Sequence, residues 1–337
     1  MPNLDLRSLA FSATLGGSYT ATGDTKYNYN GPSIAVRRTV GASILQGGIL
    51  PIDAPASNSS WSMSFNGPQL SCEVSDDHEK RELETMIANS TLTSSGCYEP
   101  PVFFSQRGSE LFEEKQNTTP SLWIAMLPSL LQPSPKAPWT PAACEHVTAL
   151  PDTGNWTSPL VPTGPDANTV MQCFLEESKY DLSFQYVNGS QSVLHRLTPT
   201  NRSLTNIEAF LNTDIINNDF LSNLAYQSVF NAFAEWITGS VLNGLWNQVP
   251  FIVNSSIMST SLLETDELSY LRPEAVDSTL ASVYYTSFQQ VVADSGSPAF
   301  RGLSARKSQN ASQRLAAMLE DIFMNATISL MSSAELQ

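Results

Sequence analysis

Several pairs of acidic residues lie close together in the sequence and are the first candidates for catalytic chemistry. A glycosidase needs two carboxyl groups that face each other across a cleft, one as acid and one as base or nucleophile. The candidate pairs are Glu82 and Glu84, Glu113 and Glu114, Glu176 and Glu177, and Glu264 and Asp266. Adjacent acids more often form a solvated surface, and the sequence does not select one pair. A secreted, carboxylate-based glycosidase is therefore an alternative hypothesis for this chain.

Ser295 is the second candidate, because the segment ADSGSP around it is similar to the nucleophile loop of trypsin-like serine proteases. In that family the serine attacks the substrate and backbone N–H groups stabilise the oxyanion. Ala293 stands here where the family has an oxyanion-binding glycine, and the segment follows a helical pattern rather than a strand. None of His78, His146 and His195 has the Ala-Ala-His-Cys setting of that family. A serine hydrolase is thus the weaker form of the hydrolase alternative.

The sequence lacks the common cofactor and metal motifs. It contains no Walker A motif, no Gly-x-Gly-x-x-Gly, no Gly-x-Ser-x-Gly and no His-Glu-x-x-His. The cysteines form no Cys-x-x-Cys pair, and His146, next but one to Cys144, has no second ligand pair to complete a zinc site. A net charge of −15, from 17 basic and 32 acidic residues, does not provide the basic face that nucleic acids need. We expect no catalytic site, cofactor, metal or nucleic acid partner.

Four cysteines point to an oxidising compartment. They are Cys72, Cys97, Cys144 and Cys173, an even number with wide spacing, which favours two disulfides over a metal site. Four cysteines allow three connectivities, and the sequence does not choose among them. Pairing nearest neighbours, Cys72 with Cys97 and Cys144 with Cys173, closes two loops of similar length, each stabilising by about 3–4 kcal/mol.

The sequence is also rich in acceptor motifs for N-linked glycans. Ser, Thr and Asn make up 93 of the 337 residues, and only 15% are charged. Asn-x-Ser/Thr occurs about twice as often as this composition gives by chance, which favours a lumenal or extracellular chain. The nine sites are Asn58, Asn89, Asn117, Asn155, Asn188, Asn201, Asn254, Asn310 and Asn325.

The targeting signals that such a chain needs are not visible in the sequence. The first residues, MPNLDLRSLAFSATLGG, have no apolar run long enough for a signal peptide. No stretch reaches the 18 apolar residues of a membrane span. We therefore expect this chain to be a piece of a larger protein.

The first two thirds of the sequence are typical of strands and loops. Residues 1–60 predict short strands and loops, and 12 of the 21 prolines fall in residues 100–165, which argues against long helices and central strands there. The predicted elements are a strand at 61–65 ended by a turn at 66–68, a helix at 76–87, strands at 170–174 and 180–187, and a hairpin at Asn188-Gly189 leading into 192–197.

The last third has a helical pattern. An apolar stripe predicts one amphipathic helix or a broken pair of helices, with Thr213 as N-cap. The stripe consists of Ile216, Phe220, Leu224, Phe233, Ile237, Val241 and Leu245. Further helices are expected from Pro273 to about Val292 and around 315–323, the latter capped by Ser312. This order predicts an α+β fold, with a β-rich, disulfide-containing part at 1–200 and a helical part at 201–337, or one composite ectodomain.

Three segments together resemble one family. They are Gly48-Ile-Leu-Pro-Ile52 with Trp61-Ser-Met-Ser-Phe-Asn-Gly-Pro-Gln-Leu-Ser-Cys72, Gln172-Cys173 with Tyr180-Asp-Leu-Ser-Phe-Gln-Tyr-Val-Asn-Gly-Ser-Gln191, and Leu319-Glu-Asp-Ile-Phe-Met-Asn325-Ala-Thr-Ile-Ser-Leu330. They resemble the large extracytoplasmic region of a family of uncharacterised fungal polytopic membrane proteins. Some members carry the label formylmethionine deformylase-like, which the missing His-Glu-x-x-His does not support.

The resemblance implies a position between N-terminal membrane helices and a C-terminal one. It implies that Cys72 and Cys173 are disulfide partners somewhere in the fold, that Asn188-Gly189 turns a hairpin, and that Asn325 is a membrane-proximal glycan site or an unused one. We therefore expect a glycosylated extracellular or lumenal domain with a binding, sensing or structural role, rather than an enzyme. Its membrane contact would lie in segments outside this chain, and its ligand or protein partner is unknown.

Overall fold

The fold comes from a computed structural model that describes residues 6, 11–19, 25–90, 101–108, 118–127, 168–200, 202–207, 210–212, 218–243, 250–253, 255–265, 267–268, 271 and 315–336. The strands are β1 (Ser12–Tyr19), β2 (Thr25–Pro32), β3 (Ser59–Val74), β4 (Pro101–Arg107), β5 (Ser121–Met126), β6 (Thr169–Val187), β7 (Ser190–Pro199), β8 (Phe210–Asn212), β9 (Gly239–Asn243) and β10 (Pro250–Val253). The helices are α1 (Ile34–Gln46), α2 (Asp77–Ser90), α4 (Asn218–Ile237) and α7 (Leu315–Ser329), with short 3-10 turns η6 (Ile257–Ser259), η7 (Ser261–Glu264) and η10 (Leu330–Ser332).

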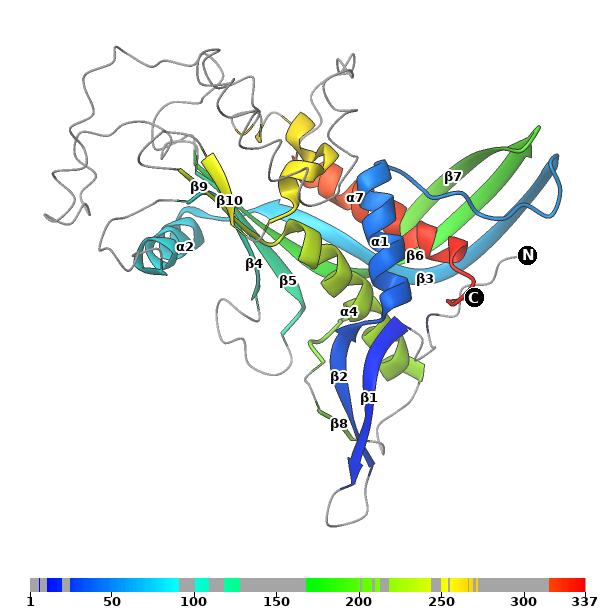
Figure 1. The fold of residues 1–337 in the computed structure, drawn as a ribbon, viewed down its shortest axis with the longest axis horizontal. Coiled ribbons are helices and arrows are strands. Elements are labelled where there is room, and N and C mark those ends of the chain that lie inside the picture. The colour runs from blue at the N-terminus through cyan, green and yellow to red at the C-terminus, as the bar shows by residue number, and fades with distance from the viewer. Residues whose placement is uncertain are drawn as a thin grey trace, which may run out of the picture.

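A seven-stranded antiparallel sheet forms the body of the molecule (Figure 1). Its order is β10-β9-β4-β5-β6-β3, and β7 also pairs with β6. The long strand β6 pairs with β3 on one side along sixteen residues, and on its other side first with β5 and then with β7. We call the three-stranded part made of 59–66, 178–187 and β7 the wing. It extends to the upper right of Figure 1.

Helices α1, α4 and α7 cover one face of the sheet and enclose the main core. Helix α7 contacts both β3 and α1, and α1 contacts α4. Phe233 of α4 and Phe323 of α7 are fully buried there, with ring centroids 5.2 Å apart and edge to face. In the wing, Trp61 stacks on Phe184 at 4.9 Å and on Tyr186 at 5.2 Å, so aromatic rings line the inner face.

Helix α2 packs on the opposite face of the sheet over a second, smaller cluster. Asp76 caps this helix, because its carboxylate accepts the backbone N–H groups of His78 and Glu79. Along β5, residues alternate between the two clusters, since Ile124 belongs to the main core and Trp123 packs under α2. All six residues of β5 are therefore buried.

A small sheet of β1, β2 and β8 lies at the bottom of Figure 1. Strand β2 contacts α4 and leads directly into α1.

The prediction of only strands and loops in residues 1–60 is wrong, because 34–46 form α1. Ser33 caps this helix by accepting the N–H of Val36, and Gly47 ends it with a left-handed φ of 69°. The buried face of the helix includes small and polar residues such as Gly41 and Ser43. Its apolar residues Val36, Val40 and Ile44 recur every four positions, but the small and polar residues between them make this stripe narrow in the sequence.

The turn predicted at 66–68 is also wrong, because β3 continues to Val74. Gly67 serves packing instead. The stacked rings of Phe65 and Tyr180 lie over it, and a Cβ there would come within 3.0 Å and 3.2 Å of them. Pro68 lies four positions before Cys72 on β3, so its backbone points away from β6 in the same way as the Cys72 N–H. The missing N–H of Pro68 therefore falls on the outer side of this edge strand, where no hydrogen bond to β6 is lost.

The expectation that the proline-rich stretch contains no central strand is wrong as well. Strands β4 and β5 lie inside the sheet, between β9 and β6. Pro101 is the first residue of β4, and β5 contains no proline. Two further corrections concern continuity. The strands expected at 170–174 and 180–187 are one strand, β6, and Val241 lies in β9 rather than in the preceding helix.

Other predictions are confirmed. The fold is α+β, the helix expected at 76–87 is α2, and Asn188 and Gly189, with φ of 52° and 80°, turn the β6–β7 hairpin. The helix around 315–323 is α7.

Residues on both sides of the boundary expected at 200 share the main core, for example Leu182 and Phe233. The caps Thr213 and Ser312 and the helix from Pro273 lie outside the described residues. Among the described helices, none has the length and apolar content that a membrane crossing requires.

Candidate functional site

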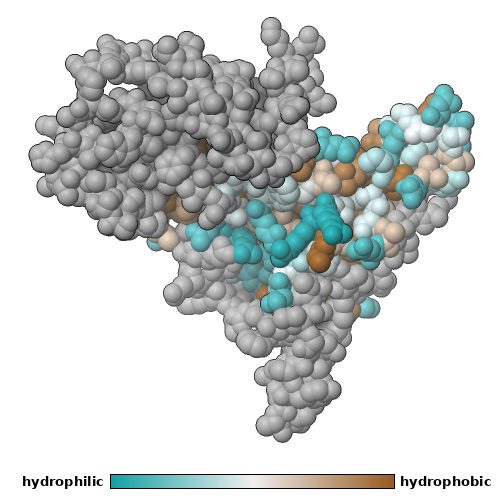
Figure 2. Space-filling model, viewed as in Figure 1, coloured by the Kyte–Doolittle hydropathy of each residue, from teal (hydrophilic) through white to brown (hydrophobic). Residues whose placement is uncertain are grey.

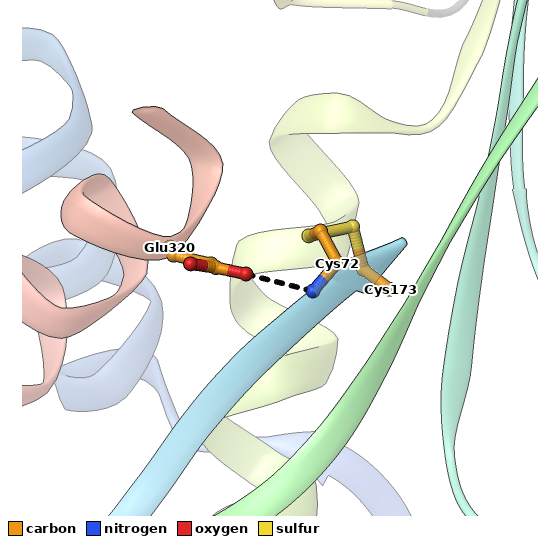
Figure 3. The surroundings of a disulfide bond; sticks show 3 residues. All are labelled: Cys72, Cys173 and Glu320. Carbon is orange, nitrogen blue, oxygen red and sulfur yellow. Dashed lines mark hydrogen bonds between the residues drawn. A yellow bond between two sulfur atoms is a disulfide. The ribbon is translucent and has the colours of Figure 1, made fainter. Parts of the chain in front are cut away.

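A disulfide between Cys72 and Cys173 joins β3 to β6 (Figure 3). The two residues lie directly opposite each other in the strand register, with Cα atoms 4.0 Å apart, and Cys173 is fully buried. The nearest-neighbour pairing that we considered, which joins Cys72 to Cys97, is therefore not found. Of the three possible connectivities, only one contains the observed bond. Cys97 and Cys144 lie outside the described residues.

Glu320 of α7 holds the disulfide end of β3. The backbone N–H of Cys72 donates to Glu320 Oε1 at 2.8 Å, as Figure 3 shows. Residues at alternate positions of an edge strand point their N–H and C=O groups away from the neighbouring strand. Four residues earlier, the C=O of Pro68 accepts hydrogen bonds from the hydroxyls of Tyr180 and Thr327. Side chains of α7 and β6 thus cover this half of the β3 edge.

The Tyr180 hydroxyl is buried where it makes this bond. Burial raises the pKa of Tyr180 well above the usual range of a tyrosine, and the bond involving Thr327 only partly offsets the effect. Tyr180 therefore remains neutral and serves as a structural donor.

Gln191 and Tyr186 of the wing bind the loop that connects α1 to β3. Gln191 Oε1 accepts the N–H of Ile52 at 2.7 Å, and Gln191 Nε2 donates to the C=O of Leu50 at 3.2 Å. The Tyr186 hydroxyl donates to the C=O of Ile52 at 2.7 Å. This loop is fixed to the wing by side-chain bonds rather than by strand pairing.

The same loop is also bound to the end of α7. The N–H of Leu50 donates to Ser329 Oγ at 2.9 Å, and Ser329 Oγ lies 3.3 Å from the hydroxyl of Ser43. The three segments that carry the family resemblance therefore meet in one hydrogen-bonded unit. The polar groups in these bonds are used to join the elements to one another.

A buried carboxylate, Glu177, joins β6 to α4. Its side chain is 4% exposed and accepts bonds from Arg202 at 2.8 Å, Thr200 at 2.7 Å and Tyr226 at 3.0 Å. Burial raises the pKa of Tyr226, and the negative charge of Glu177 raises it further. The carboxylate is saturated with donors, which suits a structural ion pair better than a general acid or base.

The described residues place three predicted glycan acceptors clearly. Asn58 and Asn188 are exposed at the tip of the wing, whereas Asn325 is half-buried within α7 and the hydroxyl residue of its motif, Thr327, is fully buried. Asn89 lies in α2. The remaining acceptors, Asn117, Asn155, Asn201, Asn254 and Asn310, lie outside the described residues.

The candidate carboxylate pairs do not form a facing pair where the structure describes both members. Glu176 is exposed and Glu177 is buried, because neighbours on a strand point to opposite faces. Glu84 accepts a bond from Asn168. Glu82 lines an open depression of about 430 Å³ with His78, Arg81 and Met86, all from α2. Glu113, Glu114, Asp266, Ser295 and His146 lie outside the described residues, as does the side chain of Glu264.

Within the part of the chain that the structure describes, no three His, Cys, Asp or Glu side chains are grouped to hold a metal ion. Comparisons with protein-family models, with curated proteins and with solved structures found no match to this chain.

Sequence reasoning did not identify Glu320 or Arg202 as important residues, and it named Glu177 only as a member of a candidate carboxylate pair. Each acts through a partner distant in sequence, which no local motif reveals. Gln191 was inside a segment of the resemblance, but the sequence did not show that it binds the loop at 50–52.

Proposed function

We propose that the chain is a glycosylated, disulfide-stabilised ectodomain of a membrane protein, with a binding, sensing or structural role at the cell surface or a lumenal membrane. The Cys72–Cys173 bond is the observation that carries this proposal. Disulfides of this kind form and persist in oxidising compartments and are rare in the cytosol. The exposed acceptors Asn58 and Asn188 support the same compartment.

The polar chemistry of the described residues favours a non-catalytic role. The carboxylate of Glu177 and the amide of Gln191 are committed to bonds between elements. The exposed face of the wing carries Ser62, Ser64 and Asp181, and Figure 2 shows mostly hydrophilic and neutral residues over the wing. A net charge of −15 favours solubility of an exposed domain. Membrane attachment is proposed through segments outside this chain.

The test is made on the full-length gene product, tagged at its native locus. Membrane and soluble fractions are separated, and each is treated with an N-glycosidase. A membrane-bound band that loses mass on treatment is the expected result. A second sample is alkylated with and without prior reduction, and we expect the cysteines to react only after reduction. A soluble product without a mass shift and with reactive thiols would refute the proposal.

A further inference from the structure

Among the residues that the structure describes, none pairs with the outer side of one half of β3, which we call the open edge. Between Ser60 and Asn66, every second residue points its N–H and C=O groups away from β6. These residues lie an even number of positions from Cys72, whose N–H points outward, and the pairing has no bulge between them. Among the described residues, these backbone groups have no partner on that side, whereas Tyr180, Thr327 and Glu320 cover the edge from Pro68 onward. The open edge is about 20 Å long at the usual rise of a strand.

This open edge lacks the devices that normally prevent strands of two molecules from pairing. The sequence SWSMSFN carries no charged residue and no proline, and its register with β6 has no bulge. Its side chains alternate, with exposed Ser62 and Ser64 on one face and the apolar Trp61, Met63 and Phe65 on the other. The pattern is typical of a segment that associates edge to edge. The other edge of the wing, β7, carries Arg196 and Pro199.

Two glycan acceptors lie together at the end of this edge. Asn58 comes two residues before Ser60, and its Oδ1 accepts the backbone N–H of Asn188 at 2.9 Å. The N–H of Gly189 donates to the C=O of Ser57, also at 2.9 Å. Both asparagines are exposed, and the bond uses only the oxygen of the Asn58 amide. Its nitrogen, the atom to which a glycan is joined, takes no part in that bond.

We propose that N-linked glycans on Asn58 and Asn188 shield the open edge of β3 against edge-to-edge association, an inference that rests on the proposed lumenal compartment. A lipid-linked oligosaccharide pyrophosphate is the donor. A bond forms between the asparagine Nδ2 and C1 of the first sugar, the bond from C1 to the pyrophosphate breaks, and the amide proton leaves as the lipid pyrophosphate is released. Glycans are bulky and solubilising at a protein surface, and both acceptors lie at the end of the open edge.

The experiment uses the protein secreted from a glycosylating eukaryotic host, compared with a Ser60→Ala/Ser190→Ala variant. These substitutions abolish both acceptor motifs but keep both asparagines and their hydrogen bond. Site occupancy is measured by peptide mass spectrometry, and association by sedimentation velocity over a series of concentrations. We expect occupied sites and a monomer for the unmodified sequence, and loss of the monomer for the variant.

A charge on the open edge should replace the glycans. Adding Ser62→Lys to the variant places a lysine on the edge and should restore the monomer. Ser192→Lys is the matched control, because Ser192 is exposed on β7, opposite Gln185 and away from β3. It adds the same charge and should not restore the monomer. Asn254→Gln/Asn310→Gln removes two other acceptors and should leave the protein monomeric.

The outcomes separate this inference from the proposed function. No glycan at any acceptor would overturn both. Glycans elsewhere, with Asn58 and Asn188 unoccupied, would overturn only the shield. A variant that stays monomeric, or that is rescued equally by both lysines, would also overturn only the shield. A misfolded variant would not be rescued by Ser62→Lys alone, so rescue restricted to that lysine excludes a general folding defect.

Discussion

Removing the Cys72–Cys173 bond should strongly destabilise the domain. The bond joins residues 101 positions apart, and closing a loop of about that length stabilises a protein by about 4.7 kcal/mol in the chain-entropy model. Replacing both cysteines by alanine also removes packing at the buried Cys173, at a further cost of about 1 kcal/mol. We expect Cys72→Ala/Cys173→Ala to lower the free energy of unfolding by about 5–6 kcal/mol.

The assay is urea unfolding of both proteins, followed by tryptophan fluorescence. With a dependence on urea of about 3 kcal/mol per molar, the midpoint should fall by about 1.5–2 M. Glu320→Gln is the matched control, because it keeps the disulfide and weakens only the bond to the Cys72 N–H, at a cost of about 1 kcal/mol. An unchanged midpoint in the double variant would refute the reasoning. So would a peptide map of the unreduced protein that joins Cys72 to Cys97.

Three further predictions concern packing and charge. Glu177→Ala should lower the free energy of unfolding in urea by about 3–5 kcal/mol, because Arg202 and Tyr226 would lose their buried acceptor. Glu176→Ala, at an exposed position, should change it by less than about 0.5 kcal/mol. Gly41→Ala should cost about 1–3 kcal/mol, since its Cβ would lie 2.7 Å from an indole of α4, and equal stability of this variant and Gly48→Ala, whose Cβ meets nothing within 4 Å, would contradict the packing described. The raised pKa of Tyr180 stabilises the folded state fully below pH 10, and this contribution is lost as the pH rises from 10.0 toward the folded pKa, by about 1.4 kcal/mol per pH unit. Unfolding at pH values below and above 10 should therefore show a loss that is smaller in Tyr180→Phe, and an equal loss in both proteins would argue against the buried hydroxyl.

The local signals in the sequence identified elements where one residue pattern has one meaning. Asn188-Gly189 between two alternating segments formed the predicted hairpin turn, and the charged segment at 76–87 formed the predicted helix. The same reasoning failed at Gly67, because glycine also permits close approach of side chains, here two aromatic rings from different strands. It failed at Ser33, where the capping residue and the narrow stripe of Val36, Val40 and Ile44 after it were not interpreted as a helix.

The site depended even more on contacts between distant residues. The number and spacing of the cysteines predicted disulfides, but the pairing of Cys72 depends on the register of two strands separated by about a hundred residues. The role of Glu177 also depends on the fold rather than on its residue type. Its sequence neighbour Glu176 has the same side chain but is exposed, whereas Glu177 is buried. The alternation of residues along each strand was visible, but which strand pairs with which, and in what register, is a property of the whole fold.

The position of the disulfide along β3 and β6 also determines the direction in which these strands can separate. Only two residue pairs, Glu73 with Gln172 and Val74 with Met171, lie beyond the bond. All other pairs lie between it and the tip of the wing. The hydrogen bonds between β3 and β6 should therefore open first at the tip of the wing, and opening should proceed toward the disulfide. Among the β3 residues whose N–H groups bond to β6, amide exchange should become progressively slower from Ser59 toward Ser71, and reduction of the disulfide should weaken that gradient.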